Sequence, residues 1–329
     1  MTTATPPTGA PACPLCRAAV SAPAIRSWRE YKLYDCPACG FGFCVPFKNP
    51  GAEYYARLEE MYPHESQTAT DPMSEEYDAC LDFFRGKNVA GQRLLDVGCG
   101  GGGFLKRARE LGFAITGIDY NAERLEAVRA ELGADVFTGS VEDFARARPD
   151  ERFDVITIFE VVEHLDDPGR WLDVMRSMLK PGGYFFIGLP NRERTFDPFT
   201  GPTMEWIDNP PHHLSRWSAV VLRRFVESHS FRVLSCASLG VPRQLLALLL
   251  RKRLQFGLAT KSLKVDQIAH VPKAGASVGP RARLILALVA VKEAGINAAA
   301  WLMYPFFRLA CRLFGWQGVI LLCVSQRRD

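Results

Sequence analysis

The sequence lacks the features that would send a chain into or across a membrane. Residues 1–12 contain no basic segment followed by an apolar one, so no secretion signal is indicated and we expect a disordered lead there. No apolar run reaches the roughly 20 residues that span a bilayer. Acids are scarce near the C-terminus, where residues 240–329 hold 14 Lys/Arg against three acids. The net charge of +4 therefore divides into +11 for this stretch and −7 for residues 1–239.

Ten cysteines in a chain without a secretion signal indicate metal binding or buried thiols rather than disulfides, and we expect a cytoplasmic protein. Four of them form two CxxC pairs, Cys13/Cys16 and Cys36/Cys39, which are separated by 19 residues. Two such pairs can complete a tetrahedral shell of four thiolates around zinc and leave no position open for water. We predict a structural zinc ribbon over residues 13–45. A redox pair or four unrelated thiols are the alternatives.

From residue 92 onward, short apolar runs alternate with amphipathic stretches, which is typical of a parallel sheet with crossover helices. The composition, 48% hydrophobic and 23% charged, is that of an ordinary globular protein. We predict an α/β fold with a seven-stranded, mostly parallel sheet. Its strands are expected at 93–97, 114–119, 134–138, 153–159, 184–189, 231–238 and 318–326, and its helices at 104–111, 122–132, 168–179 and 215–230.

A glycine loop over residues 98–103 follows the first of these strands. Glycines there let the backbone turn sharply and approach a ligand closely. Gly98, Gly100 and Gly103 also satisfy the dinucleotide pattern GxGxxG, with Asp119 at the distance of a ribose-binding acid. By itself this loop leaves an NAD-dependent oxidoreductase open as an alternative.

The wider pattern resembles the class I S-adenosylmethionine (SAM)-dependent methyltransferases, whose Rossmann-like fold it implies. The segment from Leu94 to Gly102 looks like the family's DxGxGxG motif, and residues 139–143 lie where the family holds adenine. The resemblance covers roughly residues 92–190 and includes ubiquinone-pathway O-methyltransferases. It implies SAM as cofactor. The implied cofactor-binding residues are Asp96, Gly98, Gly100, Gly102, Asp119, Tyr120, Ser140, Val141, Glu142 and Glu160.

Methyl transfer to a hydroxyl or carbon nucleophile also needs a base, and histidine suits that role near neutral pH. Glu163 and His164 follow the fourth strand, and His213 lies in a Pro-rich segment after the fifth. We predict these three as catalytic residues, with structural capping as the alternative for the Glu163–His164 pair. Glu160-x-x-Glu163-His164 also resembles a segment for which the relatives imply a divalent metal at the active site.

The remaining segments are assigned by charge and hydropathy. We expect a helical linker or lid at 46–91, the cofactor domain at 92–239, a basic, apolar helical insertion at 240–316 and the final strand at 317–329. Short apolar helices flanked by Lys/Arg suit an anionic membrane surface, here the inner face, whereas a lid or a homodimer interface would also bury them. The acceptor is expected to be a small or lipid-linked molecule methylated on oxygen. An RNA methyltransferase and an inactive binding module are alternatives, although the net-acidic ribbon and cofactor domain disfavour nucleic acid.

Overall fold

The computed structural model describes residues 10–51, 53–55, 74–196, 206–240, 246–247, 250–251 and 280–328. Of the expected disordered lead at 1–12, residues 1–9 lie outside these ranges, and of the expected linker or lid at 46–91, residues 52 and 56–73 do. The chain forms two compact units, one of residues 1–239 with 317–329 and one of residues 240–316.

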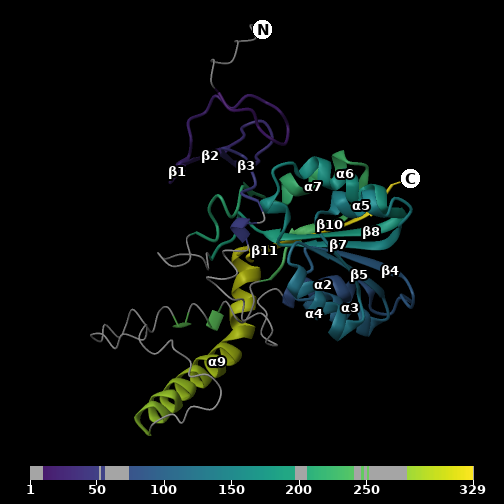
Figure 1. The fold of residues 1–329 in the computed structure, drawn as a ribbon. Helices are drawn as coiled ribbons and strands as arrows, with labels where there is room; N and C mark the ends of the chain where they lie inside the picture. Colours follow the sequence, from purple (N-terminus) through teal and green to yellow (C-terminus); the bar gives the residue numbers. More distant parts are fainter. Residues whose placement is uncertain are drawn as a thin grey trace. The chain divides into compact units, whose positions relative to one another are not determined.

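The larger unit is built on a seven-stranded sheet with the order β10-β11-β8-β7-β4-β5-β6 (Figure 1). Its parallel strands are β4 (Arg93–Val97), β5 (Ala114–Asp119), β6 (Asp135–Thr138), β7 (Phe153–Phe159) and β8 (Leu179–Pro190). β11 (Ile320–Arg327) lies antiparallel between β8 and β10 (Phe231–Ser238). The predicted Rossmann-like fold and the seven-stranded, mostly parallel sheet are confirmed.

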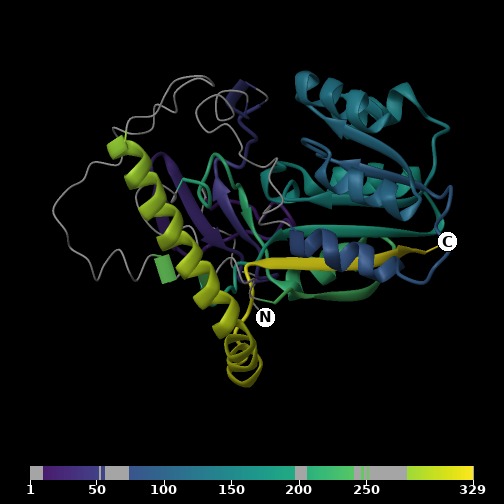
Figure 2. The same ribbon diagram turned by 90° about the horizontal axis from the view of Figure 1, so that it is seen from below.

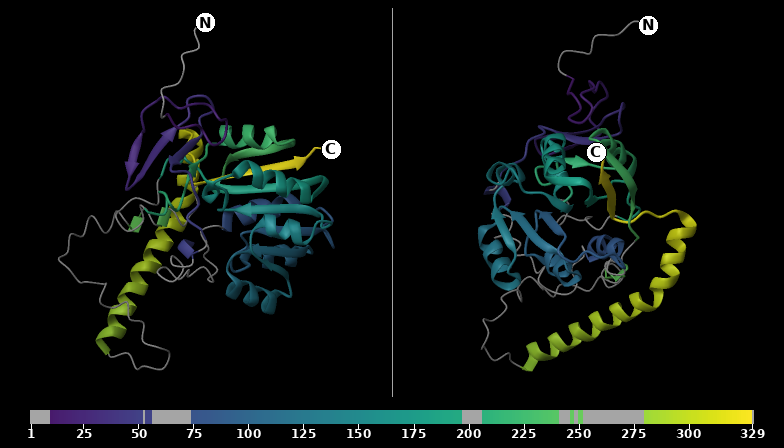
Figure 3. Two further views of the ribbon diagram at one scale, coloured as in Figure 1. Left: turned by 45° about the horizontal axis from the view of Figure 1, so that its top comes forward. Right: turned by 90° about the vertical axis from the view of Figure 1, so that its right-hand side faces the viewer.

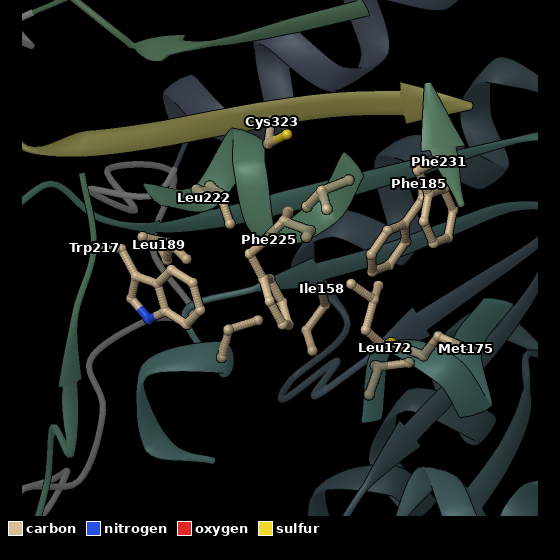
Figure 4. Close-up of a cluster of buried hydrophobic side chains, with 14 of the residues drawn as sticks. Ile158, Leu172, Met175, Phe185, Leu189, Trp217, Leu222, Phe225, Phe231 and Cys323 are labelled. Carbon is tan, nitrogen blue, oxygen red and sulfur yellow. The ribbon is translucent and has the colours of Figure 1, made fainter. Parts of the chain in front are cut away.

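Helices cover both faces of this sheet (Figures 1 and 2). One face carries α2 (Ser74–Phe84), α3 (Gly103–Leu111) and α4 (Ala122–Leu132), and the other carries α5 (Val141–Ala147), α6 (Pro168–Met178) and α7 (Ala219–Ser228). The core on the second side is shown in Figure 4, where Trp217, Phe225 and Leu222 pack beneath the antiparallel strands. The buried faces of these helices give the sheet an apolar layer on each side.

Several predicted boundaries differ from the structure by one or two residues, and two starting points differ by more. The helix expected at 215–230 begins only at Ala219, because Ser215–Arg216 form the short strand β9 and the Ser218 hydroxyl accepts a hydrogen bond from the N–H of Val221. The strand expected from 184 begins at Leu179.

The N-terminal ribbon contains β1 (Arg26–Trp28), β2 (Tyr31–Asp35) and β3 (Gly42–Val45). β3 pairs with β9, so the ribbon sheet has the order β1-β2-β3-β9. Phe41 is fully buried against Trp217, with ring centroids 4.7 Å apart. The ribbon therefore shares a sheet and a core with the cofactor domain.

The smaller unit contains the helix α9 (Pro280–Phe314). The two apolar runs that the sequence separates at Lys292 and Glu293 belong to this one helix, and Glu293 pairs with Arg251 at 2.7 Å. α9 bends in its second half (Figure 3), where Pro305 cannot donate a backbone hydrogen bond. Among the residues that the structure describes, no helix combines the length and apolarity that a membrane span requires.

Candidate functional site

The glycine loop turns directly after β4. A Cβ at Gly98, whose φ is +77°, would stand 2.4 Å from a methyl carbon of Val161, so only glycine fits under the segment that follows β7. Gly102 has φ 76° and caps the N-terminus of α3. At Gly100 a Cβ would meet nothing within 4 Å, which leaves open space on that side of the loop. The loop is thus held against Val161 at one glycine and open at another, as a phosphate- or cofactor-binding turn requires.

Two predicted acids lie beside this loop in different environments. Asp96 is buried and accepts a 2.7 Å hydrogen bond from the Thr157 hydroxyl. Burial raises the pKa of Asp96 to about 7, although the Thr157 hydrogen bond opposes the shift. Asp119 is less buried, and its carboxylate accepts hydrogen bonds from the N–H groups of Gly100 and Asn121, each at 2.9 Å. Asp119 therefore fixes the open part of the loop from the end of β5.

Of the remaining predicted cofactor-binding residues, Ser140, Val141 and Glu142 lie at the start of α5, whereas Tyr120 directly follows β5. Tyr120 is 56% exposed, whereas the Val141 side chain is fully buried in the core, so only the backbone of Val141 can face a ligand. The Ser140 hydroxyl is engaged in a capping box with Asp143, to which it donates at 2.6 Å. Glu142 lies 3.8 Å from Arg170.

The predicted catalytic residues come together with a third histidine. Glu163 and His164 lie in the 3-10 turn η1 (Val162–His164), and His212 and His213 lie in the segment before β9. The Nε2 atoms of His164 and His213 are 3.7 and 3.8 Å from Oε1 of Glu163. Nitrogen atoms of all three histidines lie within 4.8 Å of one another.

The Nδ1 atoms of His164 and His213 have partners. The Nδ1–H of His164 donates to the carbonyl of His212 at 2.6 Å. Nδ1 of His213 lies 3.3 Å from a carboxylate oxygen of Asp208, which forms a buried 2.6 Å ion pair with Arg194. A backbone carbonyl and an ionised carboxylate only accept hydrogen bonds, so both imidazoles carry the proton on Nδ1 when neutral.

Burial dominates the electrostatics of the cluster. It lowers the pKa of His164 to about 3, with the charge of His213 as a smaller cause, and it lowers the pKa of His213 as well. Burial and the nearby Glu160 raise the pKa of Glu163 well above its usual range. Burial alone would raise the pKa of Asp208, but the hydrogen bond with His213 and the charge of Arg194 hold this pKa well below its normal value.

The side chain of Glu160 interacts with Glu76, a residue that the sequence did not suggest as part of the site. Its backbone is left-handed, with φ 52°, which is uncommon for a residue with a side chain. Burial raises the pKa of Glu160 to about 7, and a hydrogen bond with Glu76 opposes this. Glu76 of α2 is completely buried. Glu76, Asp208 and Arg194 were all missed, and only the proximity of Asp208 to His212 and His213 in sequence could have signalled one of them.

Aromatic side chains surround His212. The ring centroids of Tyr54, Tyr55 and Trp206 lie 6.4, 6.1 and 5.3 Å from that of His212. Tyr55 also meets His164 edge-on at 5.6 Å. An aromatic acceptor would find flat, partly polar neighbours here.

The four ribbon cysteines also converge. Their sulfur atoms lie within 4.8 Å of one another, with 3.7 Å between Cys13 and Cys39 and 3.6 Å between Cys16 and Cys36. Zinc–thiolate bonds of 2.3 Å in a tetrahedron place the sulfurs about 3.8 Å apart. The thiols thus fit a zinc ion.

The ribbon reaches the histidine cluster through the backbone. The N–H of Cys44 in β3 donates to the carbonyl of Leu214 at 3.0 Å, and the N–H of Leu214 donates to the carbonyl of Glu163 at 2.9 Å. Arg26 of β1 hydrogen-bonds the side chain of Asn209. The segment that carries His212 and His213 is therefore held between the ribbon and η1.

The fold and the site agree with the protein family that the sequence matches. Residues 70–236, half of the chain, match the family of the methyltransferase domain, and the chain belongs to this family. The fold and the glycine loop define a class I SAM-dependent methyltransferase.

Among curated relatives, the ubiquinone biosynthesis O-methyltransferase of Thiobacillus denitrificans is 38% identical over 109 residues, which cover 32% of this chain and 47% of that protein. The enzyme of the same name from Cereibacter sphaeroides is 35% identical over 155 residues, covering 46% of this chain and 61% of the relative. The chain thus spans about half the length of the curated relatives it matches. A solved SAM-dependent methyltransferase from Archaeoglobus fulgidus aligns with a TM-score of 0.48 at 17% identity, over 83% of this chain and all of that one.

Proposed function

We propose that the protein transfers the methyl group of SAM to a hydroxyl oxygen of an aromatic small-molecule or lipid-linked acceptor. The observation that carries this proposal is the buried cluster of His164, His213 and Glu163. Glu163 and His164 lie in η1, which directly follows Val161, the residue packed on the glycine loop at Gly98. The named activity of the curated relatives supports an oxygen acceptor on a quinone-type ring.

The reaction sets two requirements that this arrangement can meet. The methyl group leaves the sulfonium sulfur for the acceptor oxygen, S-adenosylhomocysteine is released, and the hydroxyl proton must depart. Alignment of the two reactants supplies much of the rate. The Nε2 lone pairs of His164 and His213 offer a place where the proton is taken up or where an ion makes the hydroxyl acidic.

The cofactor is proposed to lie over the open side of the glycine loop. We assign the ribose hydroxyls to Asp119 and the methionine end to the loop at Gly98, Gly100 and Gly102, with Asp96 beneath. Tyr120 and the start of α5, from Ser140 to Glu142, would border adenine, with Val141 contributing its backbone N–H. Glu160 would face the methionine end. In the ribbon, Cys13, Cys16, Cys36 and Cys39 are proposed to hold a structural zinc ion.

We further propose that α9 rests on an anionic membrane surface from which a lipid-linked acceptor is drawn. Leu302, Phe306, Leu309 and Leu313 recur at helical spacing and are each more than half exposed. Arg308 and Arg312 lie on the same part of the helix. An apolar stripe beside arginines suits the interface of anionic lipids. A homodimer through this stripe is the competing occupant.

The proposal is tested by methyl transfer from labelled SAM to a panel of phenols, polyprenyl phenols and RNA. We expect the wild type to transfer labelled methyl groups to the phenols. The rate of transfer should be about 100-fold lower in His213→Gln, since a general base contributes about 10²–10⁴-fold to the rate. His229→Gln is the matched control, because His229 caps the C-terminus of α7 outside the cluster. Label on RNA but not on phenols would contradict the proposal.

A further inference from the structure

Two arginine side chains from distant parts of the sequence share one neutral oxygen atom beside the histidine cluster. Nη2 of Arg216 in β9 lies 3.4 Å from Oδ1 of Asn209, and Nη2 of Arg26 in β1 donates a hydrogen bond to the same oxygen. Among the residues that the structure describes, no acid forms an ion pair with Arg26. An amide oxygen accepts hydrogen bonds but carries no net charge, so Asn209 does not balance the two guanidinium groups.

The carboxylate of Asp208, next to Asn209 in the sequence, is already engaged. It forms its shortest ion pair with Arg194, at 2.6 Å, and lies 3.3 Å from Arg216. One carboxylate therefore faces two guanidinium groups, and Arg26 adds a further positive charge at Asn209. Because Asp208 is closest to Arg194, an excess of positive charge is left at Arg216 and Arg26. Like charges this close repel one another, and an anion placed between them removes the repulsion.

The electrostatic surroundings of Arg216 agree with this excess. Burial lowers the pKa of Arg216, whereas the charge of Asp208 raises it. Three further guanidinium groups act in the same direction as burial, those of Arg26, Arg194 and Arg192. A nearby positive charge disfavours the charged form of arginine, so Arg216 lies in a field that an added anion would relieve.

This positive group lies on the segment that carries the histidines. The N–H groups of His212 and His213 donate to the backbone carbonyl of Asn209, at 3.1 and 3.2 Å. The ring centroid of Tyr54 lies 6.4 Å from that of His212. Burial raises the pKa of Tyr54, and the charge of Arg29 opposes this shift. Arginine side chains thus border the aromatic surface beside the proposed reaction site.

We propose that Arg26 and Arg216 bind an oxyanion carried by the methyl acceptor, which is a carboxylate on its ring or a phosphate on its lipid linker. The inference rests on the proposed function and adds the charge of the acceptor to it. Guanidinium groups bind carboxylates and phosphates through paired N–H donors. Arg26 is exposed and the side chain of Arg216 is 29% exposed, so both can turn from Asn209 to a ligand.

The sheet of the ribbon explains how the two arginines meet. Arg26 pairs with Leu33 between β1 and β2, and β2 pairs with β3. In β3, Gly42 pairs with Arg216 of β9. A Cβ at Gly42 would lie 3.1 Å from the Cβ of Arg216, so the glycine leaves room for that side chain. The ribbon thereby supplies one half of the anion site and aligns the other, which gives it a part in acceptor recognition.

The test is calorimetric binding of two probe pairs to the full-length protein in the presence of S-adenosylhomocysteine. One pair is 3,4-dihydroxybenzoate and its neutral amide, and the other is geranyl phosphate and geraniol. The wild type should bind the anion of at least one pair at least about tenfold more tightly than its neutral partner, because charge-assisted hydrogen bonds are the stronger ones. The pair that shows this preference identifies the anion as a ring carboxylate or a lipid phosphate.

Two variants and a control locate the preference. Arg26→Gln and Arg216→Gln should each bring the affinity ratio below about threefold, since each removes one guanidinium group from the anion. Lys32→Gln should leave the ratio unchanged. Lys32 pairs with Ser27 and therefore lies on the opposite face of the hairpin from Arg26.

A conservative variant guards against a purely structural effect. Arg26→Lys keeps the positive charge and should retain most of the preference. An affinity ratio near one for both pairs in the wild type, or a ratio that both Gln variants leave unchanged, would overturn the inference. If neutral phenols are methylated and no anion is preferred, the proposed function stands without this site. If an anion binds through Arg26 and Arg216 but no phenol is methylated, the proposed function fails and the anion site stands.

Discussion

Replacing Asp96 by Asn is expected to stabilise the ligand-free protein, and increasingly so as the pH rises. Burial raises the pKa of Asp96 from 3.8 to about 7 in the folded state. The folded chain therefore binds more protons than the unfolded chain between these values, and stability falls as the pH rises through that window. With 1.36 kcal/mol per pH unit, the loss attributable to Asp96 between pH 5 and pH 8 is about 2.6 kcal/mol. Asn cannot ionise, yet its side-chain oxygen still accepts the Thr157 hydrogen bond.

Urea unfolding of the wild type and Asp96→Asn at pH 5 and pH 8, without SAM, measures this difference. Between pH 5 and pH 8, the free energy of unfolding of the wild type should fall by roughly 2–3 kcal/mol more than that of the variant, because the carboxyl group of Asp96 ionises and the amide group of Asn does not. Asp150→Asn serves as the control, since Asp150 is an exposed acid and its replacement should leave the pH dependence unchanged. Parallel pH dependences for wild type and Asp96→Asn would refute the reasoning.

Two further variants test the ribbon and α9. Cys36→Ser should release the ribbon zinc and displace the segment that carries His213, so methyl transfer should fall about 100-fold while the affinity for SAM changes little. Equal losses of methyl transfer and of SAM affinity would contradict this prediction. Phe306→Ser should weaken sedimentation with anionic liposomes at low salt about tenfold or more, since burying one such side chain contributes about 1.5–3 kcal/mol, and Ala298→Ser on the same helix should not. Wild-type protein that stays in the supernatant but sediments as a dimer in ultracentrifugation would assign the stripe to self-association.

The sheet was predictable because its strands are short apolar runs with clear turn signals. The strand boundaries at Arg93, Phe153 and Phe231 agree with the structure. The pairing of Ser215–Arg216 with the ribbon was not predictable, since two residues carry no periodicity and the contact lies more than 160 residues away in sequence.

The site shows the same division. The glycine loop and the cysteine pairs are local patterns, and local spacing is enough to recognise them. The histidine cluster depends on the carbonyl of His212, the carboxylate of Asp208 and the left-handed backbone of Glu160, none of which has a sequence signature. Val141 shows the limit of motif transfer, because its position matches the family while its side chain faces the core.

The most direct test of the central claim is calorimetric titration of the protein with SAM and S-adenosylhomocysteine. Wild-type protein should bind both, and Asp119→Ala should bind at least about tenfold more weakly, because a hydrogen bond to a charged group contributes about 1.5–3 kcal/mol and the loop at Gly100 loses its support. Binding of NADH without binding of SAM, or an affinity for SAM that Asp119→Ala leaves unchanged, would contradict the account.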